Sequence, residues 1–225
     1  MTIVSIFVNP TQFNSINDFK KYPRDINKDI ISLKKLKVDY LFLPKTKDIY
    51  ELKSKNFILK KKDKILCAKF RKGHFEGVLN VMNRLMSIVK SKDLFMGEKD
   101  FQQLFLIKKY LSKKFSARIN ACPSIRERNN IALSTRNRLL NKRSLNIASK
   151  VSLLMRKIKN QSKKNYQKSF LKLGFYKKKL EKEYNIKIDY LEFRDEKTLK
   201  LNFFKNKYRL FIAYHINGVR LIDNF

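Results

Sequence analysis

The sequence predicts an α/β protein that ends in a smaller α+β domain. Up to about Arg138, short β-branched apolar runs alternate with stretches of helical periodicity, an order typical of a parallel sheet with helical crossovers. After Arg138, two long Lys-rich helical stretches are followed by three strand-like runs, which is typical of helices on an antiparallel sheet. We therefore expect one domain over residues 1–138 and a smaller one over residues 139–225.

The individual elements follow from periodicity and from turn residues. Ile3–Val8 and Val38–Leu43 are apolar runs stopped by proline, and both are expected to be fully buried strands. Between them, Asp25 is expected to cap a helix whose apolar side chains share one face. The later elements are a helix over Phe75–Lys90, a strand at Leu94–Met96, a helix from about Lys99 to Lys113, a strand near Ala117–Ala121, helices to about Tyr184, and strands at Ile186–Phe193, Tyr208–Tyr214 and Val219–Ile222.

The composition is strongly basic, which suggests nucleic acid or an acidic membrane surface as a binding partner. The 225 residues hold 53 Lys and Arg against 19 Asp and Glu, a net charge of +34. Lysine is spread over every predicted element, and Ile, Asn and Phe, which share its A/T-rich codons, are abundant too. We therefore expect a codon bias rather than a specific nucleic-acid surface, with non-specific polyanion binding as a side effect. No run approaches the ~18 apolar residues of a membrane span.

Cysteine usage and the first residues indicate a cytoplasmic protein without a metal site. Cys67 and Cys122 lack the spacing of a disulfide framework or a zinc site, so buried free thiols are expected. The opening residues lack the basic and the long apolar regions of a signal peptide.

Three polar segments that follow predicted strands carry the candidate chemistry. The first is VNPTQF at Val8–Phe13, where Asn9 and Gln12 offer amide donors and acceptors to a small polar substrate. The alternative is an Asx-type turn in which the Asn9 side chain caps the following backbone.

The second segment is GEKDFQQ at Gly97–Gln103, which joins a strand to a helix. Gly97 suits a tight turn, and Lys99 at a helix start, together with free N–H groups, attracts a phosphate. Gln102 and Gln103 lie in the first turn of that helix, and their side chains are expected to point to the same ligand-binding end of the sheet. The alternative is an ordinary glycine loop with Asp100 as the helix cap.

The third segment is the loop at Arg126–Asn137. Asn129-Asn130 suits a turn that needs positive φ. The hydroxyls of Ser134 and Thr135, followed by Arg136, predict a polyphosphate clamp. Ser-Thr-Arg is also typical of a helix N-cap, which is the alternative.

In order and identity, these segments resemble the signatures of the pantothenate synthetase (pantoate–β-alanine ligase) family. The resemblance covers essentially the whole chain. The matching stretches are SIFVNPTQF at Ser5–Phe13, YPR at Tyr22–Arg24, KFRKGHFEGV at Lys69–Val78, FMGEKDFQQ at Phe95–Gln103, the loop at Arg126–Asn137 and RLIDN at Arg220–Asn224.

The resemblance implies a fold, a reaction and partners. The fold is a Rossmann-like, nucleotidylyltransferase-type ATP- and pantoate-binding domain, whose first strand is missing here, followed by the small C-terminal domain. The reaction is the ATP-dependent condensation of (R)-pantoate with β-alanine through a pantoyl adenylate, releasing AMP and pyrophosphate, in a cytoplasmic homodimer. Mg²⁺ is expected to be held mainly through the nucleotide. Another nucleotidylyltransferase shares the adenylate chemistry but does not explain VNPTQF together with GEKDFQQ, and a basic nucleic-acid-binding α/β protein is the more distant alternative.

The resemblance also implies residue roles. Gln12 and Gln103 match the glutamines that bind pantoate, and Asn9 lies beside them. His74, in the GHF motif, is expected near the site or a dimer contact, or as a structural histidine at a helix start, while His215 is expected to be structural. The residues implied in catalysis are Lys99, Ser134 and Arg136, and those implied in ATP binding are Gly97, Glu98, Lys99, Asp100, Ile125, Leu133, Ser134, Thr135 and Arg136.

Several features depart from the family pattern. Lys72 replaces a proline before Gly73, Asn129-Asn130 replaces Asp-Gly, and Thr135 replaces a serine. Family members also carry, before the strand at Ile3–Val8, a strand and helix of ~30 residues with the motif PTMGxLHxGH, whose histidines face the ATP phosphates. These 225 residues by themselves are therefore expected to be inactive or nearly so and prone to aggregate. The explanations considered are a start codon placed too late, a decaying or split gene, and a shortened non-catalytic protein.

Overall fold

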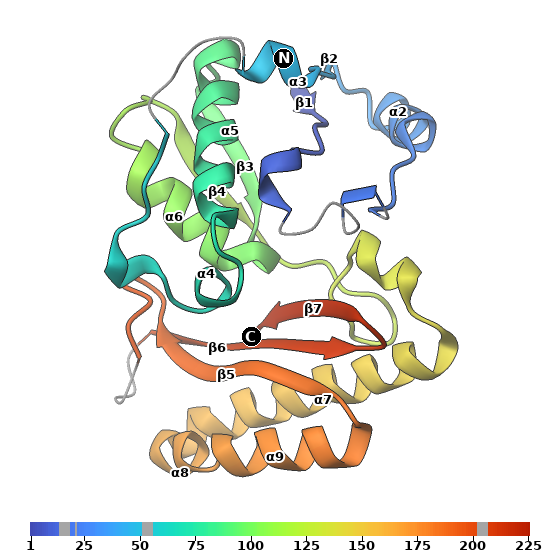
Figure 1. The fold of residues 1–225 in the computed structure, drawn as a ribbon, viewed down its shortest axis with the longest axis vertical. Coiled ribbons are helices and arrows are strands. Elements are labelled where there is room, and N and C mark those ends of the chain that lie inside the picture. The colour runs from blue at the N-terminus through green and yellow to red at the C-terminus, as the bar shows by residue number, and fades with distance from the viewer. Residues whose placement is uncertain (14–18, 21, 51–55, 202–206) are drawn as a thin grey trace. The chain divides into compact units, whose positions relative to one another are not determined.

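A computed structural model describes residues 1–13, 19–20, 22–50, 56–201 and 207–225 (Figure 1). The chain packs as two compact units. Unit 1 consists of Met1–Leu94 and Phe105–Ile119, and unit 2 consists of Phe95–Leu104 and Asn120–Phe225. This division differs from the boundary expected at residue 138, because residues 95–104 and 120–138 pack with the C-terminal sheet.

Unit 1 begins with a parallel pair of strands. β1 (Ile3–Ser5) pairs with β2 (Tyr40–Phe42), with Ile3 opposite Tyr40. The prediction of fully buried strands is wrong, since Ile3 is 43% exposed and Tyr40 is 55% exposed. Among the described strands β1 pairs with β2 alone, and a two-stranded sheet leaves an edge and parts of both faces uncovered.

Two helices of unit 1 form where the sequence predicts them. α2 (Ile26–Lys35) starts at Asp25, whose Oδ1 accepts a hydrogen bond from the Lys28 N–H at 3.0 Å. α5 (His74–Val89) confirms the helix predicted from the recurring apolar side chains. Its buried residues are Phe75, Gly77, Val78, Leu79, Val81 and Met86. Shorter helical pieces, absent from the prediction, are η1 (Pro10–Gln12), α3 (Thr46–Tyr50), η2 (Lys61–Asp63) and α4 (Cys67–Phe70).

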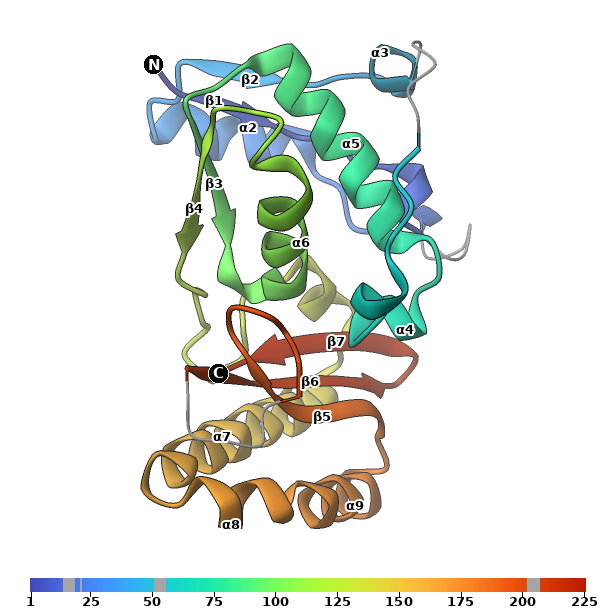
Figure 2. The same cartoon turned by 90° about the vertical axis from the view of Figure 1, so that its left-hand side faces the viewer.

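The middle of the chain alternates strand, helix and strand, as predicted. β3 (Asp93–Gly97) pairs with β4 (Arg118–Cys122), and Figure 2 shows the two side by side. Between them a short 3-10 helix, η3 (Glu98–Asp100), leads directly into α6 (Phe101–Leu111). The GEKDFQQ segment is therefore a strand-to-helix turn, as the sequence indicated.

Unit 2 ends in three helices and a three-stranded antiparallel sheet. The helices are α7 (Lys142–Lys164), α8 (Tyr166–Leu171) and α9 (Leu173–Tyr184), where the sequence predicted two. The extra break falls at Asn165, whose backbone ends α7 while its side chain accepts from the Lys168 N–H and caps α8. The strands are β5 (Lys187–Asp195), β6 (Tyr208–Ile216) and β7 (Val219–Asn224), in the order β5-β6-β7.

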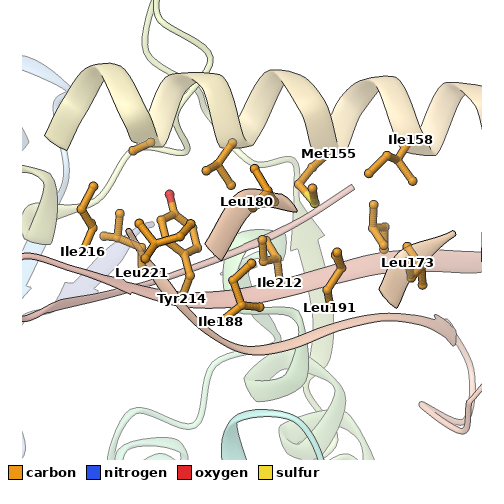
Figure 3. Packing of buried hydrophobic residues seen from close by; sticks show 14 of the residues in the cluster. Met155, Ile158, Leu173, Leu180, Ile188, Leu191, Ile212, Tyr214, Ile216 and Leu221 are labelled. Carbon is orange, nitrogen blue, oxygen red and sulfur yellow. The ribbon is translucent and has the colours of Figure 1, made fainter. Parts of the chain in front are cut away.

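The core of unit 2 lies between these helices and one face of the sheet (Figure 2). Figure 3 shows Met155 and Ile158 on the side of α7 that faces the sheet, where β6 carries Ile212, and all three residues are fully buried. This packing fixes β6 and β7, which carry side chains that hold the candidate site. Within the described ranges, no helix has both the length and the apolar character that crossing a membrane requires.

Candidate active site

In unit 1, the VNPTQF segment turns at Asn9 and enters η1. Asn9 is 1% exposed, and its Oδ1 accepts from the Tyr50 hydroxyl at 2.7 Å and from the Thr11 N–H at 3.2 Å. Its Nδ2 donates to the Gly77 carbonyl of α5 at 3.2 Å. The turn-capping alternative considered for Asn9 is thus what the geometry shows, and both ends of the amide hold the segment in place.

The backbone carbonyl of Gln12 accepts hydrogen bonds from two side chains of the KFRKGHFEGV motif. His74 Nδ1 lies 2.7 Å from this oxygen, and Arg71 Nη2 donates to it at 3.0 Å. Arg71 Nη1 also lies 2.9 Å from His74 Nε2. Since arginine only donates and a carbonyl only accepts, the ring donates from Nδ1 and accepts at Nε2, which is a neutral imidazole. The GHF motif therefore fixes the backbone from which the Gln12 side chain extends.

Gly77 lies where α5 packs closely on the VNPTQF segment. A methyl group on its Cα would lie 2.7 Å from the Thr11 carbonyl oxygen and 2.8 Å from the Thr11 hydroxyl. Both distances are shorter than any normal contact, so only glycine allows this approach of segment to helix. The second glycine of GHFEGV, Gly77, is thus explained by packing.

In unit 2, the GEKDFQQ segment places its residues around η3. Gly97 precedes η3 without a side-chain cap, Lys99 is 21% exposed, and its Nζ lies 3.4 Å from Asp100 Oδ1. Asp100 is 49% exposed, while Gln102 is 6% exposed and Gln103 is half-buried. The side chain of Gln102 is therefore buried in the protein, and the less buried Gln103 is the better placed of the two to reach a ligand.

Glu98 has a structural partner of its own. Its carboxylate lies 3.4 Å from the guanidinium of Arg209 on β6. That guanidinium also lies over the Phe101 ring, 4.3 Å from its centroid. Both acidic residues of the GEKD turn therefore have a cationic neighbour, Arg209 for Glu98 and Lys99 for the more exposed Asp100.

The loop at Arg126–Asn137 folds back on itself. The Leu133 N–H donates to the Ile125 carbonyl at 2.9 Å, and the Glu127 N–H donates to the Ile131 carbonyl at 2.9 Å. Asn130, at the tip, has a φ of 70°, so the predicted positive-φ turn is confirmed. Ile125 and Leu133, which the resemblance implies in ATP binding, are brought together and are 68% and 58% exposed.

The Ser-Thr-Arg run follows this turn at the start of η4 (Thr135–Leu139). Ser134 Oγ accepts from the Arg136 N–H at 3.3 Å, so the N-cap considered from the sequence is confirmed. Thr135 is exposed and Arg136 is half-buried. The buried Asn137 donates to Glu127 at 2.7 Å and to the Ala132 carbonyl at 3.1 Å, which ties η4 to the loop before it.

The charges around these segments suit a phosphate-bearing ligand better than a metal held by the protein. Lys99 and Arg136 lie in two segments of unit 2 that also offer the hydroxyls of Ser134 and Thr135. Among the residues that the structure describes, no group of three or more His, Cys, Asp or Glu side chains is arranged to hold a metal ion. The site residues from unit 1 are Asn9 and Gln12, and the others belong to unit 2.

Comparisons with known proteins agree with these motifs. The family profile described as pantoate-beta-alanine ligase matches residues 1–225. Proteins named pantothenate synthetase from Francisella tularensis subsp. novicida and Thermosipho melanesiensis are 39% and 36% identical, and the matches cover 100% and 99% of this chain. They cover 78% and 80% of those relatives.

Solved structures give the same result. A pantoate-beta-alanine ligase from Francisella tularensis, described as a complex with beta-gamma ATP and beta-alanine, superposes with a TM-score of 0.82 at 39% identity, over 99% of this chain and 78% of that one. A pantothenate synthetase from Thermus thermophilus superposes with a TM-score of 0.86 at 28% identity, over 99% of this chain and 82% of that one. The chain therefore belongs to the pantoate–β-alanine ligase family.

Proposed function

We propose that this chain binds ATP and pantoate and joins pantoate to β-alanine. A pantoate carboxylate oxygen attacks the α-phosphorus of ATP, the bond to the β-phosphate breaks, and pantoyl adenylate and pyrophosphate form. The amine of β-alanine then attacks the acyl carbon, loses a proton, and AMP leaves with the electron pair of the acyl–oxygen bond. The observation that carries this proposal is the match of the family profile over all 225 residues.

Each residue is assigned a role that suits the chemistry of its side chain. Gln12 and Gln103 bind the hydroxyl and carboxylate oxygens of pantoate, and the buried Asn9 holds the segment that carries Gln12. Lys99 and Arg136 neutralise phosphate charge, and the hydroxyls of Ser134 and Thr135 donate to phosphate oxygens. Gly97, Glu98 and Asp100 supply the turn, and Ile125 and Leu133 supply exposed backbone and apolar surface to the adenine. Such a site accelerates the reaction by orientation and charge neutralisation, without a nucleophile from the protein.

In this proposal Mg²⁺ enters with the nucleotide. The nucleotide-side segments of unit 2 offer cations and hydroxyls, and the Glu98 carboxylate is paired with Arg209. The ion therefore belongs to the Mg–ATP substrate and is coordinated by the phosphate oxygens. A cytoplasmic homodimer is part of the same proposal, and sedimentation equilibrium measures the association state.

The test is a reaction of the purified chain with Mg–ATP, (R)-pantoate and β-alanine, followed by mass spectrometry. We expect pantothenate and AMP in equal amounts, with no ADP. Formation of ADP, or failure to bind either ATP or pantoate, contradicts the proposal. This outcome differs from the inactivity that the sequence analysis expects of these residues by themselves, which would give binding of both ligands without release of AMP.

A further inference from the structure

We propose that Asp223 and Asn224, at the end of β7, are positioning residues for the nucleotide side of the site. Each of them holds one of the two segments to which phosphate contacts are assigned. Asn224 fixes the turn that carries Lys99, and Asp223 fixes the loop that leads to Ser134 and Arg136. This inference rests on the proposed function for the identity of the ligand, but the contacts that support it belong to unit 2 alone.

The amide of Asn224 binds the backbone of the GEKD turn. Its Nδ2 donates to the Glu98 carbonyl at 2.9 Å and to the Lys99 carbonyl at 2.9 Å. Asn224 is 4% exposed, so water does not compete for these two bonds. Both protons of one amide are therefore used to hold two consecutive carbonyls, and Lys99 extends from the second of them.

The orientation of this amide is fixed by its neighbours. Asn224 Oδ1 accepts from Arg209 Nη1 at 2.8 Å. Since arginine can only donate and carbonyls can only accept, a flipped amide would lose all three bonds. Arg209 also faces Glu98 and lies over Phe101, so one guanidinium supports the amide and the turn together.

Asp223 binds the second segment through Arg126. Arg126 Nη1 and Nη2 donate to the two carboxylate oxygens at 2.7 and 2.9 Å, a bidentate pair in which the side chains are 16% and 10% exposed. Arg126 Nη1 also donates to the Asn130 carbonyl at 3.0 Å, and Nη2 donates to the Asn224 carbonyl at 3.2 Å. The tip of the loop is thus tied to the same end of β7 as the GEKD turn.

Adjacent residues on one strand therefore fix two segments that are distant in the sequence. A catalytic side chain keeps its geometry only if its own backbone is held, because a displacement of about 1 Å lowers the rate strongly. The expected consequence of losing the Asn224 donors is weaker nucleotide binding through a displaced Lys99, in a unit that remains folded.

The main experiment compares two asparagines of the β6–β7 hairpin. Asn224→Asp replaces the amide donors with an oxygen that repels the two carbonyls. The matched control is Asn217→Asp, whose amide donates at 2.7 Å to the Oγ of Ser144 in α7. Calorimetry with a non-hydrolysable ATP analogue is expected to show about tenfold weaker binding for Asn224→Asp and a change below about twofold for Asn217→Asp. Asn224→Ser, which removes the donors without adding charge, is expected to weaken binding in the same direction.

A double-mutant cycle separates positioning from a general loss of structure. If Asn224 acts through Lys99, then Asn224→Asp adds less than about threefold to the loss already caused by Lys99→Met. If the losses multiply in full, or if Asn224→Asp and Asn224→Ser bind the analogue like the unsubstituted chain, the inference is wrong.

Hydrogen exchange makes the test independent of the proposed function. Peptides that cover residues 95–104 are expected to exchange their amide hydrogens faster in Asn224→Asp than in the unsubstituted chain. In Asn217→Asp the exchange rate of these peptides is expected to stay the same. If the unsubstituted chain does not bind the analogue, the proposed function fails, and the exchange result alone decides the positioning role. Equal exchange in both variants overturns it.

Discussion

Gln12 and Lys99 are held in the same way although they belong to different units. The carbonyl of Gln12 accepts from Arg71 and His74, and the carbonyl of Lys99 accepts from Asn224. In both cases the side chain assigned to a ligand extends from a backbone that another segment fixes. This arrangement restricts the position of a flexible side chain without using its own polar atoms.

The histidine of this arrangement gives a test with a matched control. His74→Phe keeps a ring of similar size beside Phe75, 4.9 Å away between centroids, but removes the bond to the Gln12 carbonyl. We expect pantoate binding to weaken about tenfold, as for other lost buried hydrogen bonds, with the affinity for ATP little changed.

The control is His215→Phe, because the chain has only two histidines. His215 Nε2 lies 3.2 Å from Asp189 on the C-terminal sheet, where the sequence predicted a structural histidine. We expect calorimetric titration to give this variant the same affinity for pantoate as the unsubstituted chain. Equal affinities of all three proteins for pantoate would show that the GHF motif does not position Gln12.

The residues proposed to contact ligands could be predicted from the sequence, but the contact that fixes the backbone of Lys99 could not. Gln12, Lys99 and Ser134 lie in short motifs, whose residue types and order can be read along the chain. The contact from Asn224 to Lys99 spans 125 positions, and contacts of this length leave no local pattern. The RLIDN motif marked Asn224 as a matching residue, but only the fold shows what its amide does.

At the scale of secondary structure, the start of α5 is shaped by its contact with the VNPTQF segment. Glycine inside a helix is normally less stable than alanine by about 1 kcal/mol. Gly77 is the opposite case, because a methyl group there meets the Thr11 backbone at 2.7 Å. We expect Gly77→Ala to lower the free energy of unfolding by about 1–3 kcal/mol.

Gly174 in α9 is the matched control for this helix effect. No atom lies within 4 Å of a methyl group built at Gly174, so Gly174→Ala should be stabilising by about 0.5–1 kcal/mol. Urea denaturation of both variants shows whether each substitution raises or lowers the free energy of unfolding. A stabilising Gly77→Ala would mean that the VNPTQF segment does not pack on α5 as described.

The contact between α7 and β6 predicts a dependence of stability on pH. Lys159 donates to the Tyr208 carbonyl and lies over the Tyr208 ring, 3.7 Å from its centroid. Burial lowers the pKa of its ammonium to about 8, against a usual value near 10.5. The ring favours the charged form and burial favours the neutral one, and the lowered pKa gives burial the larger effect.

The sign follows from proton binding. Between pH 8 and 10.5 the unfolded chain binds more protons at Lys159 than the folded chain, so the free energy of unfolding rises with pH in this window. Lys159→Met has no group that titrates at this position and serves as the reference. Relative to it, the free energy of unfolding of the unsubstituted chain should rise by about 1–2 kcal/mol between about pH 7 and 9.5, a figure reduced for the partial exposure of Lys159. Urea titrations at the two pH values measure this difference. A loss instead of a gain would mean that the ring contact outweighs burial.

The elements themselves show where sequence patterns succeed. The helix at α5 and the antiparallel strands β5 to β7 were predicted because their apolar side chains follow a regular period. The exposure of β1 and β2 was not predicted, since an apolar run indicates a strand but not how many strands lie beside it. The break at Asn165 was missed because lysine-rich helices continue on both sides of it.

At the scale of the whole molecule, the net charge of +34 is spread over both units and opposes compactness. Screening this repulsion should raise the melting temperature by about 2–5 °C between about 20 and 300 mM NaCl. Differential scanning calorimetry at constant pH measures the shift. A melting temperature that falls with salt would mean that attractive ion pairs, such as Arg126 with Asp223, outweigh the excess of positive charge.

The division into units also changes how the sequence is understood. The expected boundary at residue 138 follows the change from alternating strands and helices to the Lys-rich helices. The structure instead groups residues 95–104 with the C-terminal sheet, because Arg209 and Asn224 bind the GEKD turn. Side-chain hydrogen bonds and ion pairs of this kind determine which segments pack into one unit. They cannot be recognised from changes in composition along the chain.

Separate titrations with a non-hydrolysable ATP analogue and with pantoate test the central claim most directly. The proteins are the unsubstituted chain, Lys99→Met and Gln103→Leu. The account predicts that Lys99→Met weakens the nucleotide about tenfold or more and pantoate less than about threefold, and that Gln103→Leu gives the reverse. Unchanged binding of both ligands in both variants would contradict the assignment of Lys99 to ATP and of Gln103 to pantoate.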